Sequence, residues 1–113
     1  MQECALPNSP SVIHQNRQIG ELKKTNKDSA TQNLKRALSY YMAALKFDQE
    51  LNNKAGIARH LGNIGSVYCS LEEYSLAIEY IHQALQINKE ISNANRIAIL
   101  NLNIGEIYQR EGK

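Results

Sequence analysis

The chain contains 113 residues and carries a net charge of +2, with 13 basic and 11 acidic residues interspersed along it. This length fits one domain or part of one, and the lack of charge blocks argues against nucleic acid or a strongly acidic partner. No apolar run approaches the ~20 residues of a membrane span, and the N-terminus lacks the apolar core of a signal peptide. We therefore expect a soluble, cytoplasmic protein that does not bind membranes.

The N-terminal part of the chain has the weakest pattern. Residues 1–10 are polar and contain both prolines, so we predict that they are disordered. From residue 11 to about residue 24, Val12, Ile19 and Leu22 mark one face of a weak helix. Residues 25–29 are polar and are predicted to form the turn that follows it.

Four stronger helices are predicted over residues 30–52, 55–70, 73–92 and 95–110. In each of them, apolar residues recur at the spacing of one helical face. Ser29 with Gln32, and Ser70 with Glu73, have the spacing of a capping box at a helix start. Connections of only a few residues predict that consecutive helices are antiparallel.

From residue 37 onward, the sequence repeats itself with a period of 40 residues and without a gap. Residues 63–68 read Asn-Ile-Gly-Ser-Val-Tyr, and residues 103–108 read Asn-Ile-Gly-Glu-Ile-Tyr. The same shift aligns further identical pairs: Ala37 with Ala77, Tyr40 with Tyr80, Ala44 with Ala84, Leu45 with Leu85, Asn53 with Asn93 and Ile57 with Ile97. A fixed period of roughly 20 to 50 residues is typical of a solenoid of stacked units.

These positions resemble the tetratricopeptide repeat, in its long-period form with an asparagine ahead of the apolar residue and the glycine. Ile64, Gly65 and Tyr68 match the family's pattern on the first helix of a hairpin. The matching residues on the second helix are Tyr74, Ala77, Ala84 and Leu85. The resemblance implies an all-α fold, a tetratricopeptide-type superhelix of antiparallel helical hairpins. Residues 11–113 would then hold a degraded first repeat over 11–52, a full repeat over 55–92 and a half repeat over 95–113.

Two glycines lie inside predicted helices. A glycine there costs about 1 kcal/mol relative to alanine, so Gly65 and Gly105 need a packing reason. We expect Gly65 to face Ala77 across the hairpin, where a side chain would hold the two helices apart.

The resemblance also implies where a partner binds. In tetratricopeptide proteins, the first helix of each hairpin lines a concave groove that holds an extended peptide or a partner's helix. Eight residues transfer to this groove: Arg59, Asn63, Ser66, Ser70, Ile99, Asn103, Glu106 and Arg110. Asn63 and Asn103 match the family's groove asparagine, whose carboxamide both donates to and accepts from a peptide group. The alternative is that these two asparagines bond neighbouring helices.

We therefore predict a scaffold that binds a protein or peptide partner and does not bind nucleic acid. The alternative function is a sensory or regulatory repeat segment of a larger bacterial signalling protein, such as a kinase or transcription regulator. An output domain encoded further along the gene would distinguish the two.

The chain shows no pattern of catalytic chemistry. His14, His60 and His82 lack metal-ligand spacing, and His60 and His82 are interpreted as solvated or edge positions of helices. No nucleophile and base are paired, and no glycine-rich phosphate loop is present. We predict no enzyme activity, no catalytic residue, no metal and no cofactor.

The last predicted helix has an apolar stripe that the preceding hairpin covers only in part. Burying a large aliphatic side chain contributes about 1.5–3 kcal/mol, so an uncovered stripe favours association. We therefore expect that the isolated chain either self-associates through residues 95–110 or frays from about residue 95. The alternative, which we favour, is that the chain is a fragment of a longer array in which a further helix covers the stripe.

Overall fold

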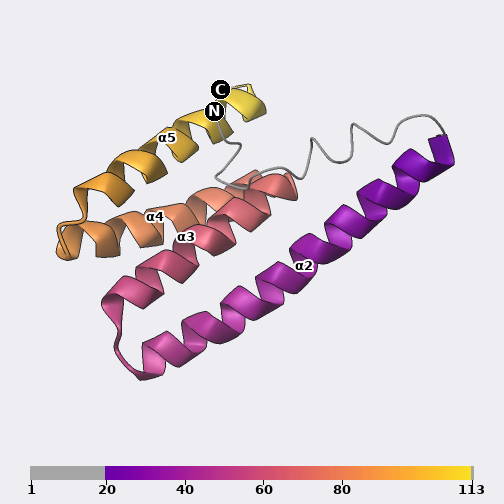
Figure 1. Ribbon diagram of the computed structural model, residues 1–113. Coiled ribbons are helices and arrows are strands. Elements are labelled where there is room, and N and C mark those ends of the chain that lie inside the picture. Colours follow the sequence, from indigo (N-terminus) through magenta and orange to yellow (C-terminus); the bar gives the residue numbers. More distant parts are fainter. Residues whose placement is uncertain (1–19, 113) are drawn as a thin grey trace.

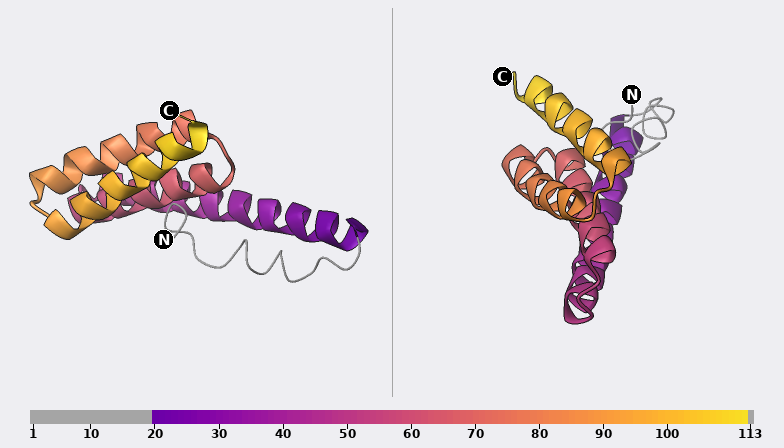
Figure 2. Two further views of the ribbon diagram at one scale, coloured as in Figure 1. Left: turned by 90° about the horizontal axis from the view of Figure 1, so that it is seen from above. Right: turned by 90° about the vertical axis from the view of Figure 1, so that its left-hand side faces the viewer.

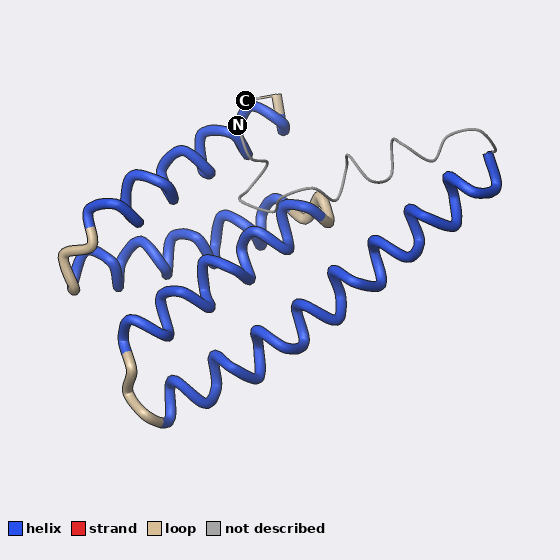
Figure 3. The backbone as a smooth tube through the Cα atoms, viewed as in Figure 1, coloured by secondary structure: helices blue, strands red, loops and turns tan. Residues whose placement is uncertain are grey.

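The computed structural model describes residues 20–112, which form four α-helices joined by short turns (Figure 1). They are α2 (Gly20–Glu50), α3 (Lys54–Ser70), α4 (Tyr74–Glu90) and α5 (Ala94–Glu111). Residues 20–112 contain no strand, and consecutive helices are antiparallel (Figure 3). The predicted all-α fold is confirmed, and the predicted bounds of the last three helices agree with α3, α4 and α5 within two residues at each end.

The predicted start of the first strong helix is wrong. The sequence pattern predicts a start at residue 30 after a turn over residues 25–29, but α2 begins at Gly20 and is continuous through residues 25–29. Residues 21–50 include no glycine or proline, so nothing in the backbone interrupts the helix. Ser29 therefore lies inside α2 and starts no helix. Of the weak helix predicted over residues 11–24, residues 11–19 lie outside the described residues, as do residues 1–10.

The three turns are built in the same way and lie 20 residues apart. Their central residues, Asn52, Glu72 and Ser92, have the left-handed conformation, with φ of 55°, 62° and 58°. The backbone N–H of the next residue reaches back to the helix that has just ended: Asn53 to Asp48, Glu73 to Tyr68 and Asn93 to Asn88, each at 2.9 Å. This hydrogen bond is the mark of a Schellman motif, which satisfies carbonyl groups at a helix C-terminus.

Two of the turns also cap the following helix with an asparagine. The Asn53 Oδ1 accepts from the Gly56 N–H, and the Asn93 Oδ1 accepts from the Arg96 N–H, both at 3.2 Å. Glu73 precedes α4 without a side-chain cap. The capping box predicted for Ser70 with Glu73 is therefore wrong, because Ser70 is still the last residue of α3.

Helix α3 lies at the centre of the described structure, against α2 on one side and α4 on the other, and α5 packs on α4. The core is aliphatic, and its fully buried large side chains are Ile64, Val67, Ile81, Leu100 and Ile107. A Cβ atom on Gly65 would lie 2.7 Å from the Ile81 Cγ1 and 3.1 Å from the Ala77 carbonyl oxygen. The prediction that Gly65 faces Ala77 at a close helix contact is confirmed.

None of the described helices is long and apolar enough to cross a membrane. Helix α2 is much longer than its neighbours, and its N-terminal end extends away from the other three helices (Figure 2).

Candidate functional site

The eight predicted groove residues lie on α3 and α5, which run in the same direction and touch. A Cβ atom on Gly62 of α3 would lie 3.1 Å from the Arg96 Nη2 and 3.6 Å from the Leu100 Cδ2, both on α5. Further along the two helices, the Arg110 Nη1 donates to the Cys69 Sγ at 3.8 Å. We call the faces of α3 and α5 that carry these eight residues the inner surface.

On α3, the predicted residues range from exposed to buried. Arg59 is exposed, Asn63 and Ser70 are partly buried, and Ser66 is buried. Of these four residues, Arg59 and Asn63 are therefore the two that offer a guanidinium or a carboxamide with access to solvent.

On α5, Ile99 is an exposed large apolar residue, whereas Asn103 is buried. Glu106 and Arg110 are partly buried one helical turn apart, with 4.0 Å between the Glu106 Oε1 and the Arg110 Nη2. Arg59, Asn63 and Ile99 are thus the predicted residues of the inner surface that are best placed to meet a partner.

A pocket of about 240 Å³ opens where α3, α4 and α5 meet. Its lining residues come from the start of α3, the end of α4 and the start of α5, and we call them the arginine pocket: Ala55, Arg59, Asn88, Ile91, Asn93 and Arg96. The lining includes no acidic residue, and neither arginine forms an ion pair with any described residue. The pocket therefore presents two uncompensated guanidinium groups.

Arg96 is a residue that sequence reasoning missed. It begins the stripe Arg96, Ile99 and Asn103 on α5, but the groove positions transferred from the repeat start one turn later. One period earlier its position is occupied by Gly56, so comparison of the two copies provides no signal for it.

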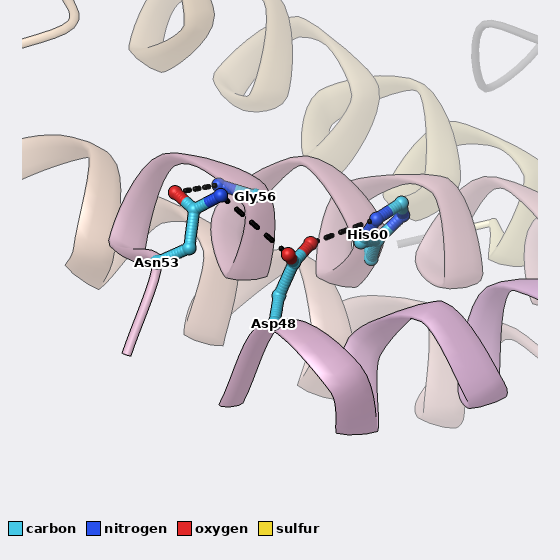
Figure 4. Close-up of polar contacts among 4 residues, drawn as sticks. All are labelled: Asp48, Asn53, Gly56 and His60. Carbon is cyan, nitrogen blue, oxygen red and sulfur yellow. Dashed lines mark hydrogen bonds and ion pairs between the residues drawn. The ribbon is translucent and has the colours of Figure 1, made fainter. Parts of the chain in front are cut away.

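A polar cluster joins α2 to α3 (Figure 4). The Asp48 carboxylate accepts from the His60 Nε2 at 3.0 Å and from the Asn53 Nδ2 at 3.5 Å, and Asn53 in turn caps α3 at Gly56. His60 therefore does not lie on a solvated face but in a nearly buried contact between helices. One period later, Asn88 and Leu100 stand at the positions of Asp48 and His60, so the cluster occurs once.

This cluster has the character of a structural contact. A catalytic base or metal ligand needs room for a substrate or an ion beside it, whereas Asp48 and His60 are both largely buried between helices. Within residues 20–112, no group of three or more histidine, cysteine, aspartate or glutamate side chains is arranged to hold a metal ion.

Comparison with known proteins agrees with the helical arrangement. The family model described as tetratricopeptide repeat matches residues 56–113, which include α4, α5 and nearly all of α3. No curated protein and no solved structure matches the chain.

Proposed function

This chain belongs to the tetratricopeptide repeat family, whose repeats generally mediate protein–protein interaction, and we propose that it binds a partner's peptide or helix along the inner surface. The family is typically a non-catalytic scaffold, and its partners are typically proteins. The observation that carries the specific proposal is the arginine pocket, because it opens at the end of this surface.

The pocket favours an acidic group on the partner. Arg59 and Arg96 approach it from two different helices, and a guanidinium forms paired hydrogen bonds with a carboxylate. An ion pair formed here would also be more favourable than on an open surface, because part of the surrounding water is excluded.

The rest of the proposed site lies next to the pocket on the same two helices. Ile99 follows Arg96 by one turn of α5 and offers apolar surface, and Asn63 follows Arg59 by one turn of α3 and offers a carboxamide. We therefore propose a partner segment with an acidic residue followed by an apolar one, whose backbone pairs with Asn63. Ser66, Ser70, Asn103, Glu106 and Arg110 continue the inner surface beyond this point.

The test is a binding screen on an array of short peptides of varied charge and apolar content, followed by fluorescence anisotropy on the best binder. Arg59→Ala combined with Arg96→Ala is expected to weaken binding at least ~10-fold, since each charged hydrogen bond contributes about 1.5–3 kcal/mol. Arg36→Ala combined with Lys46→Ala is the matched control, because it removes the same charge from exposed positions of α2.

The salt dependence of binding provides a second readout. Added salt is expected to weaken binding of an acidic peptide to the unchanged protein, and to have less effect on the pocket variant. Equal loss of binding in the pocket variant and in the charge-matched control would refute the pocket as the site. The absence of any peptide binder on the array would refute the proposed function itself.

The alternative function is a regulatory repeat segment of a larger signalling protein, whose partner would bind the same surface. It remains a prediction. The peptide screen would identify a ligand under both functions, and an output domain encoded further along the gene would distinguish them.

A further inference from the structure

Helix α2 carries an exposed stripe that is covered on its counterpart one period later. The stripe consists of Ala37, Tyr40, Ala44, Phe47 and Leu51. Tyr40 is 71% exposed and Phe47 is 62% exposed, and Ala37 and Ala44 are partly exposed. Ala37, Tyr40 and Ala44 correspond to Ala77, Tyr80 and Ala84 of α4, where the two alanines are fully buried. Helix α3 covers this face of α4.

Helix α5 corresponds to α3, but the face that α3 packs against α4 is less covered on α5. Gly65 of α3 is in close contact with α4, whereas a Cβ atom on Gly105 of α5 would meet nothing within 4 Å. Ile64 is fully buried, but Ile104 only in part. Tyr68 stacks on Tyr80 of α4 with 5.6 Å between ring centroids. Its counterpart Tyr108 is 40% exposed.

We propose that α5 of one copy of this chain packs against α2 of a second copy in the geometry of the α3–α4 hairpin. The hairpin within each copy is the template for the contact between copies. Tyr108 would stack on the second copy's Tyr40, as Tyr68 stacks on Tyr80. Gly105 would lie against the second copy's Ala37, as Gly65 lies against Ala77.

The repeat favours a second copy of this chain over an unrelated partner as the occupant of both faces. The exposed face of α2 has the residue types with which α4 receives α3, and the exposed face of α5 has the glycine and tyrosine with which α3 docks. At Ala37, Tyr40 and Ala44 on α2, and at Gly105 and Tyr108 on α5, each face presents the residues that the other needs, in the same register. Since the two faces differ, the contact is head-to-tail and extends the superhelix by one copy at a time.

Three differences between the copies make this contact weaker than the internal hairpin. Tyr41 of α2 stands where α4 has Ile81, the nearest neighbour of Gly65. Asn101 of α5 stands where α3 has the buried Leu61. In the hairpin, Lys54 and Glu90 form an ion pair at 3.1 Å. The matching positions of the contact between copies hold Ala94 and Glu50, so this ion pair is lost. Association is therefore reversible and depends on protein concentration.

The test uses two variants that each block one face. Tyr40→Glu leaves the α5 face intact, and Tyr108→Glu leaves the α2 face intact. Both tyrosines are exposed, so circular dichroism and the midpoint of thermal unfolding are expected to match the unchanged protein in dilute solution. Sedimentation velocity over a series of concentrations then measures association of each variant alone and of the two mixed.

The head-to-tail contact predicts a pattern that no symmetric contact produces. The unchanged chain forms oligomers that grow with concentration, each variant alone is monomeric, and the equimolar mixture stops at a dimer with one copy of each. A strictly monomeric unchanged chain would overturn the proposal. So would oligomers of Tyr40→Glu alone, which indicate an α5–α5 contact, or a mixture that stays monomeric.

Discussion

Gly65 and Gly105 form a matched pair that isolates the free energy of a close helix contact. Alanine at position 65 would bring its Cβ atom within 2.7 Å of the Ile81 Cγ1 and 3.1 Å of the Ala77 carbonyl oxygen. Ile81 is fully buried, and the carbonyl belongs to the backbone of α4, so neither moves away easily. Overpacking of this kind typically costs about 1–3 kcal/mol. Alanine at position 105 meets nothing within 4 Å.

The intrinsic gain of alanine over glycine in a helix is about 1 kcal/mol and applies at both positions. The difference between the two free energies of unfolding therefore contains the packing cost alone, and we expect Gly65→Ala to be less stable than Gly105→Ala by about 1–3 kcal/mol. For a domain of this size, that corresponds to a difference of at least ~4 °C in the midpoint of thermal unfolding. Gly65→Leu should cost more than Gly65→Ala.

Urea unfolding of both variants in dilute solution, followed by circular dichroism, measures the difference directly. Equal stabilisation by the two alanines would refute the reasoning, because it would mean that α3 and α4 do not meet at Gly65.

Three further predictions concern the turn, the tyrosine stack and the buried pair. Glu72→Gly relieves a left-handed conformation that disfavours residues with a Cβ atom, and should raise the free energy of unfolding by up to ~1 kcal/mol; a decrease would contradict this. Burial, the neighbouring Tyr80 and then Glu73 raise the pKa of Tyr68 above its ordinary 10.0, so stability should fall as the pH rises above that value. Denaturant unfolding at alkaline pH should show a smaller fall for Tyr68→Phe. Asp48→Ala leaves the buried His60 Nε2 without its acceptor and should cost about 1–3 kcal/mol, whereas Asp48→Asn should cost less.

The sequence predicted the helices and their packing wherever one copy of the repeat could be checked against the other. The bounds of α3, α4 and α5 and the role of Gly65 followed in this way. The start of α2 lies before the repeat begins at residue 37, so only local turn preference was available there. Local preference for a turn is weak beside an uninterrupted run of helix-forming residues.

The candidate site was less predictable because part of it has no counterpart. Arg96 stands where the preceding copy has Gly56, and the pair of Asp48 with His60 is replaced by Asn88 and Leu100 in the next copy. A repeat pattern emphasises what the copies share, which is packing. The groups that differ between copies are the ones that give this chain its charged pocket and its polar cluster.

The two copies of the repeat also show that the environment of a side chain depends on which helix lies beside it. Tyr68 and Tyr108 occupy the same position of the repeat, yet one is stacked on Tyr80 and the other is exposed. In a solenoid, stability is close to a sum over units and their interfaces, so an interface formed with a second copy contributes as an internal one does. Gly105→Ala should therefore be harmless to a single copy in dilute solution but should weaken association at high concentration, where alanine would meet α2 of the next copy. One substitution, measured at two concentrations, thus separates the cost of folding from the cost of assembly.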